Sequence, residues 1–330
     1  MSNFLFTSPA SVLKIATFDS GVGGYHITDK LYRLSPYYNL IPHEIIHIAD
    51  TKNLPYGTKN SSQIIQYVSN IAFYTLSQGC DYFIICCNTA SVHYDAIVEH
   101  LSQRGVNNAA DKIISLKSFT YKILNDFCLP YLDKEQDIHL LFLATRATIT
   151  SRNYVNYLIE RYNLPPCESI VAQTHDEYLT EQLHFETALK TKIHITQFAP
   201  LKWVSMIESD TDTQIIQDSV RDNLSSLTDY THTPFSAVGL FCTHYPLIKQ
   251  EILNGLMDLN PHHHASIFLS QTDGVVSYIF DILKTDSSQD VILYNPKIYV
   301  TDSNDTDFKH LFARLFPQTQ NAEFIPLSSL

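Results

Sequence analysis

The chain has 330 residues, of which 45% are hydrophobic and 17% charged, a composition that suits a globular protein of two α/β domains or one large one. Its 22 basic and 34 acidic residues give a net charge of −12, so nucleic acid is not an expected partner. No apolar run reaches the length of a membrane span, and six cysteines in so long a chain do not suggest a secreted disulfide framework. We therefore expect a cytoplasmic protein with reduced thiols and no membrane association.

A glycine-rich turn follows the first expected strand. Residues 14–18 are predicted to form that strand, and Asp19-Ser20-Gly21-Val22-Gly23-Gly24 leads from it into a helix over 26–34. Glycines let the backbone turn tightly and approach a ligand at the helix N-terminus. The turn lacks both G-x-G-x-x-G and the Lys-Ser/Thr pair of a P-loop, so it does not predict nucleotide binding.

Two histidine-rich stretches raise the question of a metal. Residues 43–47 match H-E-x-x-H, which binds zinc when it lies on a helix. Pro42 before it and the β-branched residues within it favour a strand instead, which would hold His43 and His47 too far apart to share an ion. The run at 262–264 is interpreted as a solvated turn. No metal site is predicted.

Two expected strands each end at a cysteine. The apolar run 82–87 reads as a buried parallel strand that delivers Cys87 to its carboxyl end, and 237–241 delivers Cys242 in the same way. A lone cysteine at such a place is usually a small buried hydrophobe. Ligands of open α/β sheets nevertheless bind beyond the strand ends, and polar residues follow both thiols. The two cysteines therefore occupy equivalent places in two halves of the chain.

Strands alternate with helices along the rest of the chain, which predicts an α/β protein with mainly parallel sheets. The expected helices are 61–76, 92–101, 154–162, 275–283 and 308–316, and the expected strands are 113–116, 138–144 and 265–269. Residues 174–226 are predicted to be mostly helical with a break at Pro200. The polar stretch 105–108 suggests a boundary between an N-terminal half, 1–108, and a second half, 109–269. We assign 113–116 and 138–144 to the second half and expect 270–330 to complete the first.

Four sequence blocks together resemble the signatures of cofactor-independent glutamate racemases. They are DSGVGG at 19–24, D-T-x-x-x-P-Y-G at 50–57, CNTAS at 87–91 and CTHYPL at 242–247. The resemblance implies two α/β domains, related by a pseudo-twofold axis, that face each other across a cleft with one catalytic thiol in each. It implies interconversion of L- and D-glutamate, a supply of D-glutamate for peptidoglycan, and neither metal nor pyridoxal phosphate nor another cofactor. Family members are commonly dimers, so a homodimer is compatible with it.

Inversion of a stereocentre without a cofactor needs a base on one face of the α-carbon and a proton donor on the other. A cysteine with an ordinary pKa of about 8.5 needs help to act near neutrality. Asp19 is the candidate to assist Cys87, and His244 to assist Cys242, with Asp50 as a further assisting residue. The resemblance suggests that Cys87 acts on the D-isomer and Cys242 on the L-isomer. The residues expected to bind substrate are Asp19, Ser20, Tyr56, Gly57, Asn88, Thr89, Thr148, Thr243 and His244.

Three features depart from the family pattern. Phe241 stands where the family usually has glycine, and Trp203 stands where it has an acidic residue, with Glu208 as the nearest substitute. The chain also has extra length around 174–196. Two alternatives therefore stay open: an aspartate or broader amino-acid racemase of the same superfamily, or a catalytically degenerate protein that binds an amino acid or a protein partner. Cys87→Ala or Cys242→Ala would abolish racemisation but leave mere binding largely unchanged.

Overall fold

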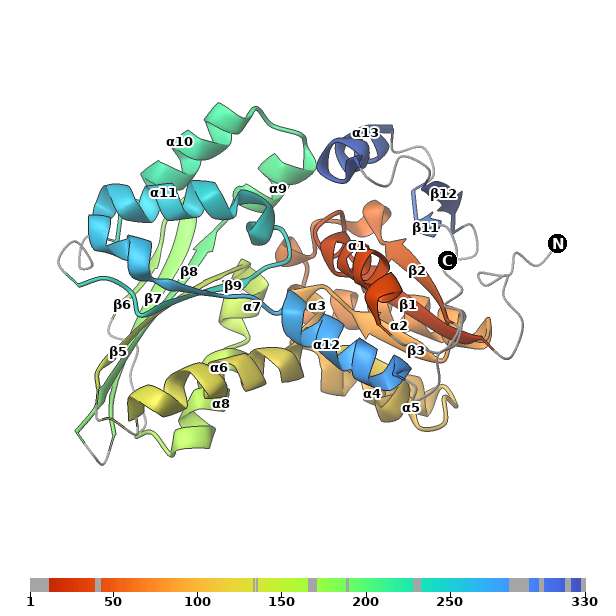
Figure 1. Cartoon of the computed structure of the whole chain (residues 1–330), viewed down its shortest axis with the longest axis horizontal. Helices are drawn as coiled ribbons and strands as arrows, with labels where there is room; N and C mark the ends of the chain where they lie inside the picture. Colours follow the sequence, from red (N-terminus) through yellow and green to blue (C-terminus); the bar gives the residue numbers. More distant parts are fainter. Residues whose placement is uncertain are drawn as a thin grey trace. The chain divides into compact units, whose positions relative to one another are not determined.

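The chain folds into two compact units, which are described separately. The computed structural model describes residues 12–38, 43–132, 134, 136–165, 171–187, 190–227, 233–284, 297–302, 306–317 and 322–327 (Figure 1). Unit 1 comprises Met1–Lys117 and Thr272–Leu330, and unit 2 comprises Ser118–Gln271. Of the six cysteines, Cys167 lies outside the described residues, and the five described ones are free.

Unit 1 is built on a six-stranded sheet in the order β12-β11-β2-β1-β3-β4. Its strands are β1 (Leu13–Asp19), β2 (His43–Ala49), β3 (Tyr82–Ile85), β4 (Ile113–Ser115), β11 (Lys297–Val300) and β12 (Glu323–Pro326). Every neighbouring pair is parallel. The carboxyl ends of β1, β2 and β3 therefore meet at one edge of this sheet.

Helices supply the apolar faces that cover this sheet. They are α1 (Tyr25–Leu34), α2 (Ser61–Ser77), α3 (Asn88–Ser91), α4 (Tyr94–Gln103), α5 (Ala109–Lys112), α12 (Thr272–Leu283) and α13 (Thr306–Leu315). A capping box begins α2, because Asn60 accepts the Gln63 backbone N–H while the Gln63 side chain accepts the Asn60 N–H. Tyr25 of α1 packs against Phe312 and Phe316, at ring distances of 4.4 and 4.9 Å, which ties the C-terminal segment to the first helix.

Unit 2 has its own six-stranded sheet, in the order β10-β9-β5-β8-β7-β6. Its strands are β5 (Ile138–Ala144), β6 (Val171–Thr174), β7 (Tyr178–Glu186), β8 (Lys192–Pro200), β9 (Ala237–Phe241) and β10 (Ile267–Leu269). β10, β9, β5 and β8 pair in parallel, whereas β7 and β6 add two antiparallel strands at one side. The expectation of α/β architecture with mainly parallel sheets is confirmed.

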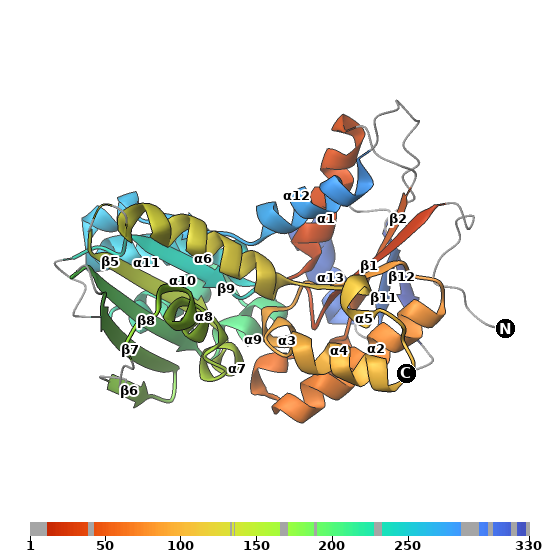
Figure 2. The ribbon, with the colours of Figure 1, turned by 90° about the horizontal axis from the view of Figure 1, so that it is seen from below.

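The unit 2 sheet lies between α10 and α11 on one face and α6 and α8 on the other (Figures 1 and 2). Its helices are α6 (Leu116–Leu132), α7 (Arg146–Thr150), α8 (Asn153–Tyr162), α9 (Trp203–Glu208), α10 (Thr213–Leu224) and α11 (Lys249–Leu259). A buried cluster joins Leu141, Val238 and Leu240 of the sheet to Val220 of α10 and Ile252 of α11. Hydrophobic burial against α10 and α11 thus helps to hold the strands of this unit in place.

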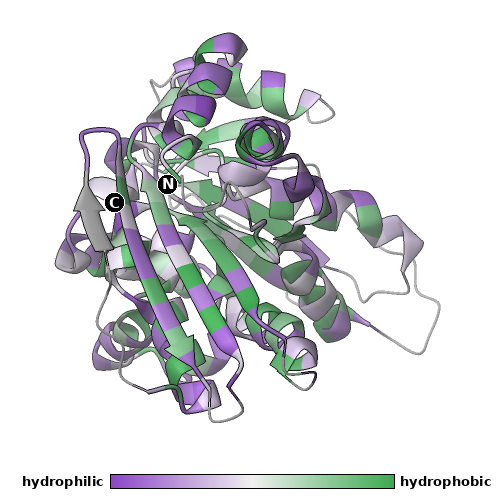
Figure 3. Ribbon diagram, turned by 90° about the vertical axis from the view of Figure 1, so that its left-hand side faces the viewer, coloured by the Kyte–Doolittle hydropathy of each residue, from purple (hydrophilic) through white to green (hydrophobic). Residues whose placement is uncertain are grey.

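One prediction of secondary structure and one assignment of a strand to a unit were wrong. Residues 174–226 begin with strands rather than helices, since β7 and β8 occupy most of the stretch before Pro200, and only α9 and α10 are helical. Leu183, Phe185, Ile193 and Ile195 are buried at alternate positions, which is the period of a strand, and Figure 3 shows the alternating bands along the sheet. Strand 113–116 was assigned to the second half, but β4 pairs with β3 and belongs to unit 1.

The H-E-x-x-H stretch lies in strand β2, as predicted, with all seven residues of the strand buried. His47 Nδ1 lies 3.0 Å from Thr17 Oγ1. The expectation for 262–264 was only partly right: His262 and His264 are exposed, but His263 is buried and accepts the Phe235 N–H at 3.2 Å. Among the described residues, no three His, Cys, Asp or Glu side chains are arranged to hold a metal ion. None of the helices in the described part of the chain is long and apolar enough to cross a membrane.

Candidate active site

Three strand ends of unit 1 bring together the residues predicted to surround Cys87. Asp19 ends β1, and its carbonyl accepts the N–H of Asp50, which follows β2, at 3.0 Å. Just after β3, the Cys86 N–H donates to the Phe18 carbonyl at 2.7 Å. Backbone pairing therefore fixes Asp19, Asp50 and Cys87 at one edge of the parallel sheet.

The Cys87 thiol lies among small polar groups. Its sulfur is 3.7 Å from the Ser20 hydroxyl oxygen, and the residue is only 4% exposed. The Cys87 carbonyl accepts the Ser91 N–H at 2.8 Å, so the chain turns into α3 directly after the thiol. Asn88 and Thr89, both predicted to bind substrate, are buried in this first turn. The Cys87 thiol is therefore flanked by the Ser20 hydroxyl and by the polar first turn of α3.

Asp19 is fully buried, and the glycine-rich turn holds its carboxylate. The Gly21 N–H donates to Asp19 Oδ1 at 2.9 Å. A Cβ atom at Gly24 would lie 2.7 Å from Asp19 Cβ and 2.9 Å from Cys86 Cβ, closer than real Cβ contacts come. Gly24 is therefore required because the helix start packs directly on the residues beside the thiol.

Asp50 organises the loop that carries Tyr56 and Gly57. It is fully buried and accepts hydrogen bonds from the Tyr56 hydroxyl at 2.6 Å, the Thr301 hydroxyl at 2.7 Å and the Asn53 amide at 3.0 Å. Burial, together with the Asp50 carboxylate, raises the pKa of Tyr56 well above its usual value. The Tyr56 hydroxyl thus stays protonated and donates to Asp50, while its oxygen can still accept one bond. Thr301 comes from a distant part of the chain and was not among the predicted site residues.

In unit 2, the second thiol is the first of three hydrogen-bonded side chains. Cys242 follows β9 and is 4% exposed. Its sulfur lies 3.7 Å from His244 Nδ1, and His244 Nε2 lies 2.5 Å from Glu208 Oε1. The side chains of His244 and Glu208 are 4% and 7% exposed. The predicted pair of Cys242 and His244 is therefore together, and Glu208 completes it.

The hydrogen bonds and charges around His244 favour its positively charged form. Burial alone would lower the pKa of His244, but hydrogen bonds to Cys242 and Glu208 and the negative charge of Glu208 raise that pKa well above its usual value. His244 can then donate one N–H to the carboxylate and the other toward the Cys242 sulfur. An imidazolium beside a thiol stabilises its thiolate form, which is the form that removes a proton.

Glu208, the nearest acidic residue after Trp203 in the sequence, lies beside His244. Trp203 and Glu208 lie on α9, at its two ends. Trp203 is fully buried and meets Tyr245 edge to face at 5.5 Å, while Glu208 reaches His244. The sequence identified Glu208 only as a substitute and left it out of the site residues, because α9 was not resolved as a separate helix within 174–226.

Phe241 does not share a face of the sheet with the neighbouring thiol. Its ring packs against Phe142 at 5.0 Å and Tyr154 at 4.9 Å, over the space that Gly239 leaves open. Cys242 instead belongs to the buried cluster on the opposite face. Successive strand residues point to opposite faces, so the replacement of glycine by Phe241 is accommodated away from the sulfur.

Hydroxyl groups from a second strand end accompany Cys242. Thr145 follows β5 and caps α7, accepting the Thr148 N–H at 3.4 Å, and the two hydroxyl oxygens are 3.0 Å apart. The Tyr245 hydroxyl donates to the Ala144 carbonyl at 3.4 Å, which links the β5 and β9 ends. Thr148 and Thr243 are both buried.

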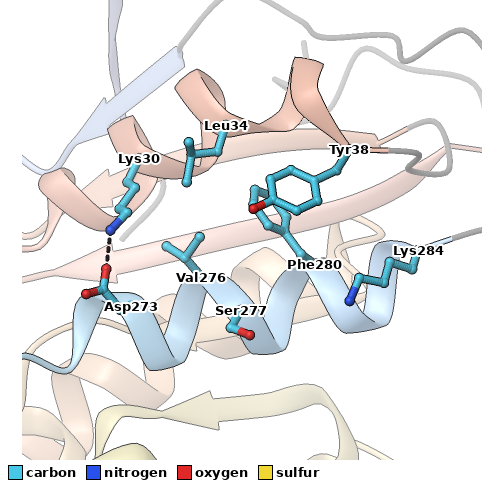
Figure 4. Close-up of a pocket in the computed structure, with 8 residues that line it drawn as sticks. All are labelled: Lys30, Leu34, Tyr38, Asp273, Val276, Ser277, Phe280 and Lys284. Atoms are coloured by element: carbon cyan, nitrogen blue, oxygen red, sulfur yellow. Dashed lines mark hydrogen bonds and ion pairs between the residues drawn. The ribbon is translucent and has the colours of Figure 1, made fainter.

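A separate groove of about 230 Å³ lies between α1 and α12 in unit 1 (Figure 4). None of the predicted site residues lines it. Lys30 pairs with Asp273, Lys284 pairs with Asp281 at 2.7 Å, and the Tyr38 and Phe280 rings lie 4.6 Å apart. Both ammonium groups already meet a carboxylate, so the groove offers an anion little uncompensated charge.

The fold and these sites define an α/β protein with a buried, hydrogen-bonded thiol beyond a strand end in each unit. No protein-family model matches the chain. A curated glutamate racemase of Hydrogenobaculum sp. is 25% identical over 294 residues, 86% of this chain and 87% of that protein. Another, of Campylobacter jejuni, is 27% identical over 298 residues, 89% of this chain and 94% of that protein.

Solved structures agree in fold. The structure of glutamate racemase from Francisella tularensis in complex with D-glutamate matches with a TM-score of 0.64 at 20% identity, over 98% of this chain and 100% of that one. The resemblance to glutamate racemases that the four sequence blocks indicated is confirmed by these relatives.

Proposed function

We propose that the chain is a cofactor-independent glutamate racemase that uses Cys87 and Cys242 as its two bases. The observation that carries the proposal is the buried chain from Cys242 through His244 to Glu208, which gives a cysteine the partner it needs to act as a base. The Cys87 environment, with Ser20 at 3.7 Å, supports a second reacting thiol. The similarity to curated glutamate racemases supports glutamate as the substrate.

In the L-to-D direction, the Cys242 thiolate removes the α-proton of L-glutamate. The electron pair of the broken C–H bond passes into the α-carboxylate, and the Cys87 S–H group delivers its proton to the opposite face of the α-carbon. Cys242 is then a thiol and Cys87 a thiolate, ready for the D-to-L direction. Each turnover breaks one C–H and one S–H bond and forms one of each.

His244 acts on the reaction through Cys242. As an imidazolium held by Glu208, His244 stabilises the Cys242 thiolate that removes the α-proton of L-glutamate. In the D-to-L direction it stabilises the same thiolate, which forms when Cys242 gives its proton to the α-carbon. Asp19 is the candidate to assist Cys87 in a different way: its carboxylate, fixed by the Gly21 N–H in the turn that carries Ser20, can accept a proton but does not stabilise a thiolate by its charge. Asp50 assists indirectly by holding Tyr56 in place.

The substrate carboxylates and ammonium need hydrogen-bond partners that are fixed before the reaction begins. We assign these to Ser20, Asn88 and Thr89 of unit 1 and to Thr148 and Thr243 of unit 2, all of which are buried. The backbone of Tyr56 and Gly57 completes the set. Preorganised donors stabilise the negative charge that develops on the α-carboxylate as the proton leaves.

The product D-glutamate is a constituent of bacterial peptidoglycan, so we place the enzyme in cytoplasmic cell-wall precursor synthesis, with a homodimer as the expected assembly. An aspartate or broader racemase would use the same two thiols with a different set of donors. The case for a degenerate binding protein rested on Phe241 and Trp203, and it weakens because Phe241 packs away from Cys242 and Glu208 lies beside His244.

The test is incubation of the reduced protein with L-glutamate, L-aspartate and L-glutamine in D₂O without added cofactor, followed by chirality and α-deuteration. The proposal expects inversion with deuterium incorporation for glutamate alone. Inversion of aspartate at a similar rate would favour the broader racemase. No exchange with any of the three, in folded protein with free thiols, would refute the assignment.

A further inference from the structure

Three histidines occupy paired positions of three adjacent strands, on one face of the unit 2 sheet. His139 of β5 pairs in register with His194 of β8, and His194 pairs with His184 of β7. The His139 and His194 rings are stacked, with centroids 4.4 Å apart and planes within 12°. The His184 ring meets His194 edge-on, at 4.5 Å and 75°. We call these three residues the histidine row.

Two nitrogens of the histidine row are directed at each other. The Nδ1 atoms of His184 and His194 form a hydrogen-bonded pair. All three residues are half-buried, so solvent and ions reach them. A neutral imidazole offers one lone pair and one N–H, so the facing nitrogens hold a single proton between them. A metal ion can replace that proton if the two rings separate slightly.

The geometry allows that separation. Zinc binds imidazole nitrogen at about 2.0–2.1 Å, so two nitrogens on one tetrahedral ion stand roughly 3.3 Å apart. Directly opposed residues of antiparallel strands have Cβ atoms about 4.5–5.5 Å apart, a spacing that two imidazoles bridge to one ion by small side-chain rotations. The stacked His139 ring limits the rotation of His194 and so keeps its Nδ1 directed at His184.

The row is distinct from the thiol site. His139 and His194 lie near the amino ends of β5 and β8, whereas Thr145 and Cys242 follow the carboxyl ends of β5 and β9. His184 belongs to the stretch of extra length around 174–196, where β7 joins the sheet. The Cys242 chain uses none of these histidines.

We propose that His184 and His194 form a two-imidazole site for a divalent transition ion of the Zn²⁺, Co²⁺ and Ni²⁺ class, with water as the remaining ligands and His139 as a positioning residue. Imidazole favours these ions, whereas Mg²⁺ and Ca²⁺ prefer oxygen ligands. Because no three suitable side chains among the described residues surround one point, the protein supplies two ligands. The ion would join β7 to β8 and stabilise the outer strands of the sheet.

Co²⁺ is the probe, because its absorption distinguishes the ligands. Imidazole and water ligation gives weak visible bands, whereas thiolate ligation adds an intense near-ultraviolet band, so binding at Cys87 or Cys242 would be recognised. The full-length reduced protein, stripped of metal, is titrated alongside His184→Gln, His194→Gln and His139→Phe. The matched control is the double variant His262→Gln/His264→Gln, which removes two exposed histidines of the same unit.

The proposal expects one Co²⁺ per chain without a thiolate band, at least tenfold weaker binding in His184→Gln and in His194→Gln, and unchanged binding in the control. His139→Phe keeps the stack and should weaken binding less than threefold. Zn²⁺ should raise the Tm of the wild type and not that of His194→Gln. Far-UV circular dichroism establishes that each variant is folded, and each ligand variant tests the site independently. Equal binding by wild type and both ligand variants, loss of binding only in the control, or a thiolate spectrum alone would overturn the proposal.

Discussion

Replacement of Glu208 by glutamine tests most sharply the role of the hydrogen-bonded series Cys242, His244 and Glu208. The change keeps the size of the side chain and a hydrogen-bonding group within reach of His244 Nε2, 2.5 Å from Glu208 Oε1, but removes the negative charge. Without that charge, burial is opposed mainly by the contact with Cys242, and the pKa of His244 falls from its raised value. A smaller fraction of His244 is then protonated, so less positive charge lies beside Cys242.

The size of the effect follows from the burial of the pair. Both side chains are less than a tenth exposed, so solvent does not replace the lost charge. Removal of one partner of a buried ion pair costs about 3–5 kcal/mol, which the protein avoids only by releasing the His244 proton. Lost acid–base assistance is worth about 10²–10⁴-fold in rate. We expect kcat/KM to fall roughly 10²-fold or more, and equally in both directions because the two enantiomers have the same free energy.

The assay is racemisation of L- and D-glutamate over a pH series. Since the folded pKa of His244 is raised, its paired state is fully present below about pH 6.5 and is lost as pH rises through the raised pKa. In Glu208→Gln that loss should move to lower pH. The control is Asp258→Asn, which breaks the exposed pair with Arg221 and should leave kcat/KM unchanged. A Glu208→Gln enzyme within threefold of wild type, with the same pH profile, would refute this role.

Three further changes probe the units separately. Burial lowers the pKa of His47 to about 3, so its neutral form stabilises the fold and that stability is lost as pH falls below about 6.5. Between pH 7 and 5 the wild type should lose about 2 kcal/mol more unfolding free energy in urea than His47→Asn, and an equal loss would contradict this. In Gly239→Ala, the new Cβ would meet the Phe241 ring at 2.5 Å, so calorimetry should show a lower Tm that the added change Phe241→Leu restores. Failure of the double variant to recover would argue against the clash. Thr301→Val removes a hydrogen bond to Asp50, worth about 1.5–3 kcal/mol, and should lower kcat/KM at least tenfold. Thr301→Ser keeps the hydroxyl and should not lower it. Equal activity of the two variants would exclude the contact from catalysis.

The thiols and their immediate neighbours could be predicted because their signals are local. A short apolar run that ends in Cys87 or Cys242 identifies a buried strand, and parallel strands place their carboxyl ends together. Gly24 is explained by its contact with Asp19 and Cys86, and the sequence alone showed only that the turn was rich in glycine. The four sequence blocks together indicated the resemblance to glutamate racemases.

The missed features depend on contacts between distant residues. Thr301 reaches Asp50 across 251 positions, a pairing that no local pattern contains. The strands β7 and β8 were predicted to be helical because three consecutive polar residues of β7, Thr180, Glu181 and Gln182, interrupt the alternation of apolar and polar positions that identifies a strand. Once those residues were assigned to helix, the short helix that carries Glu208 could not be recognised as a separate element.

The central claim is that two thiols act on one α-carbon, and the most direct measurement compares Cys87→Ser and Cys242→Ser with the wild type in D₂O. The account predicts that neither variant inverts glutamate in either direction. Residual α-deuteration should be confined to L-glutamate when Cys242 remains and to D-glutamate when Cys87 remains. Racemisation by either variant at a rate near that of the wild type would contradict the two-thiol account.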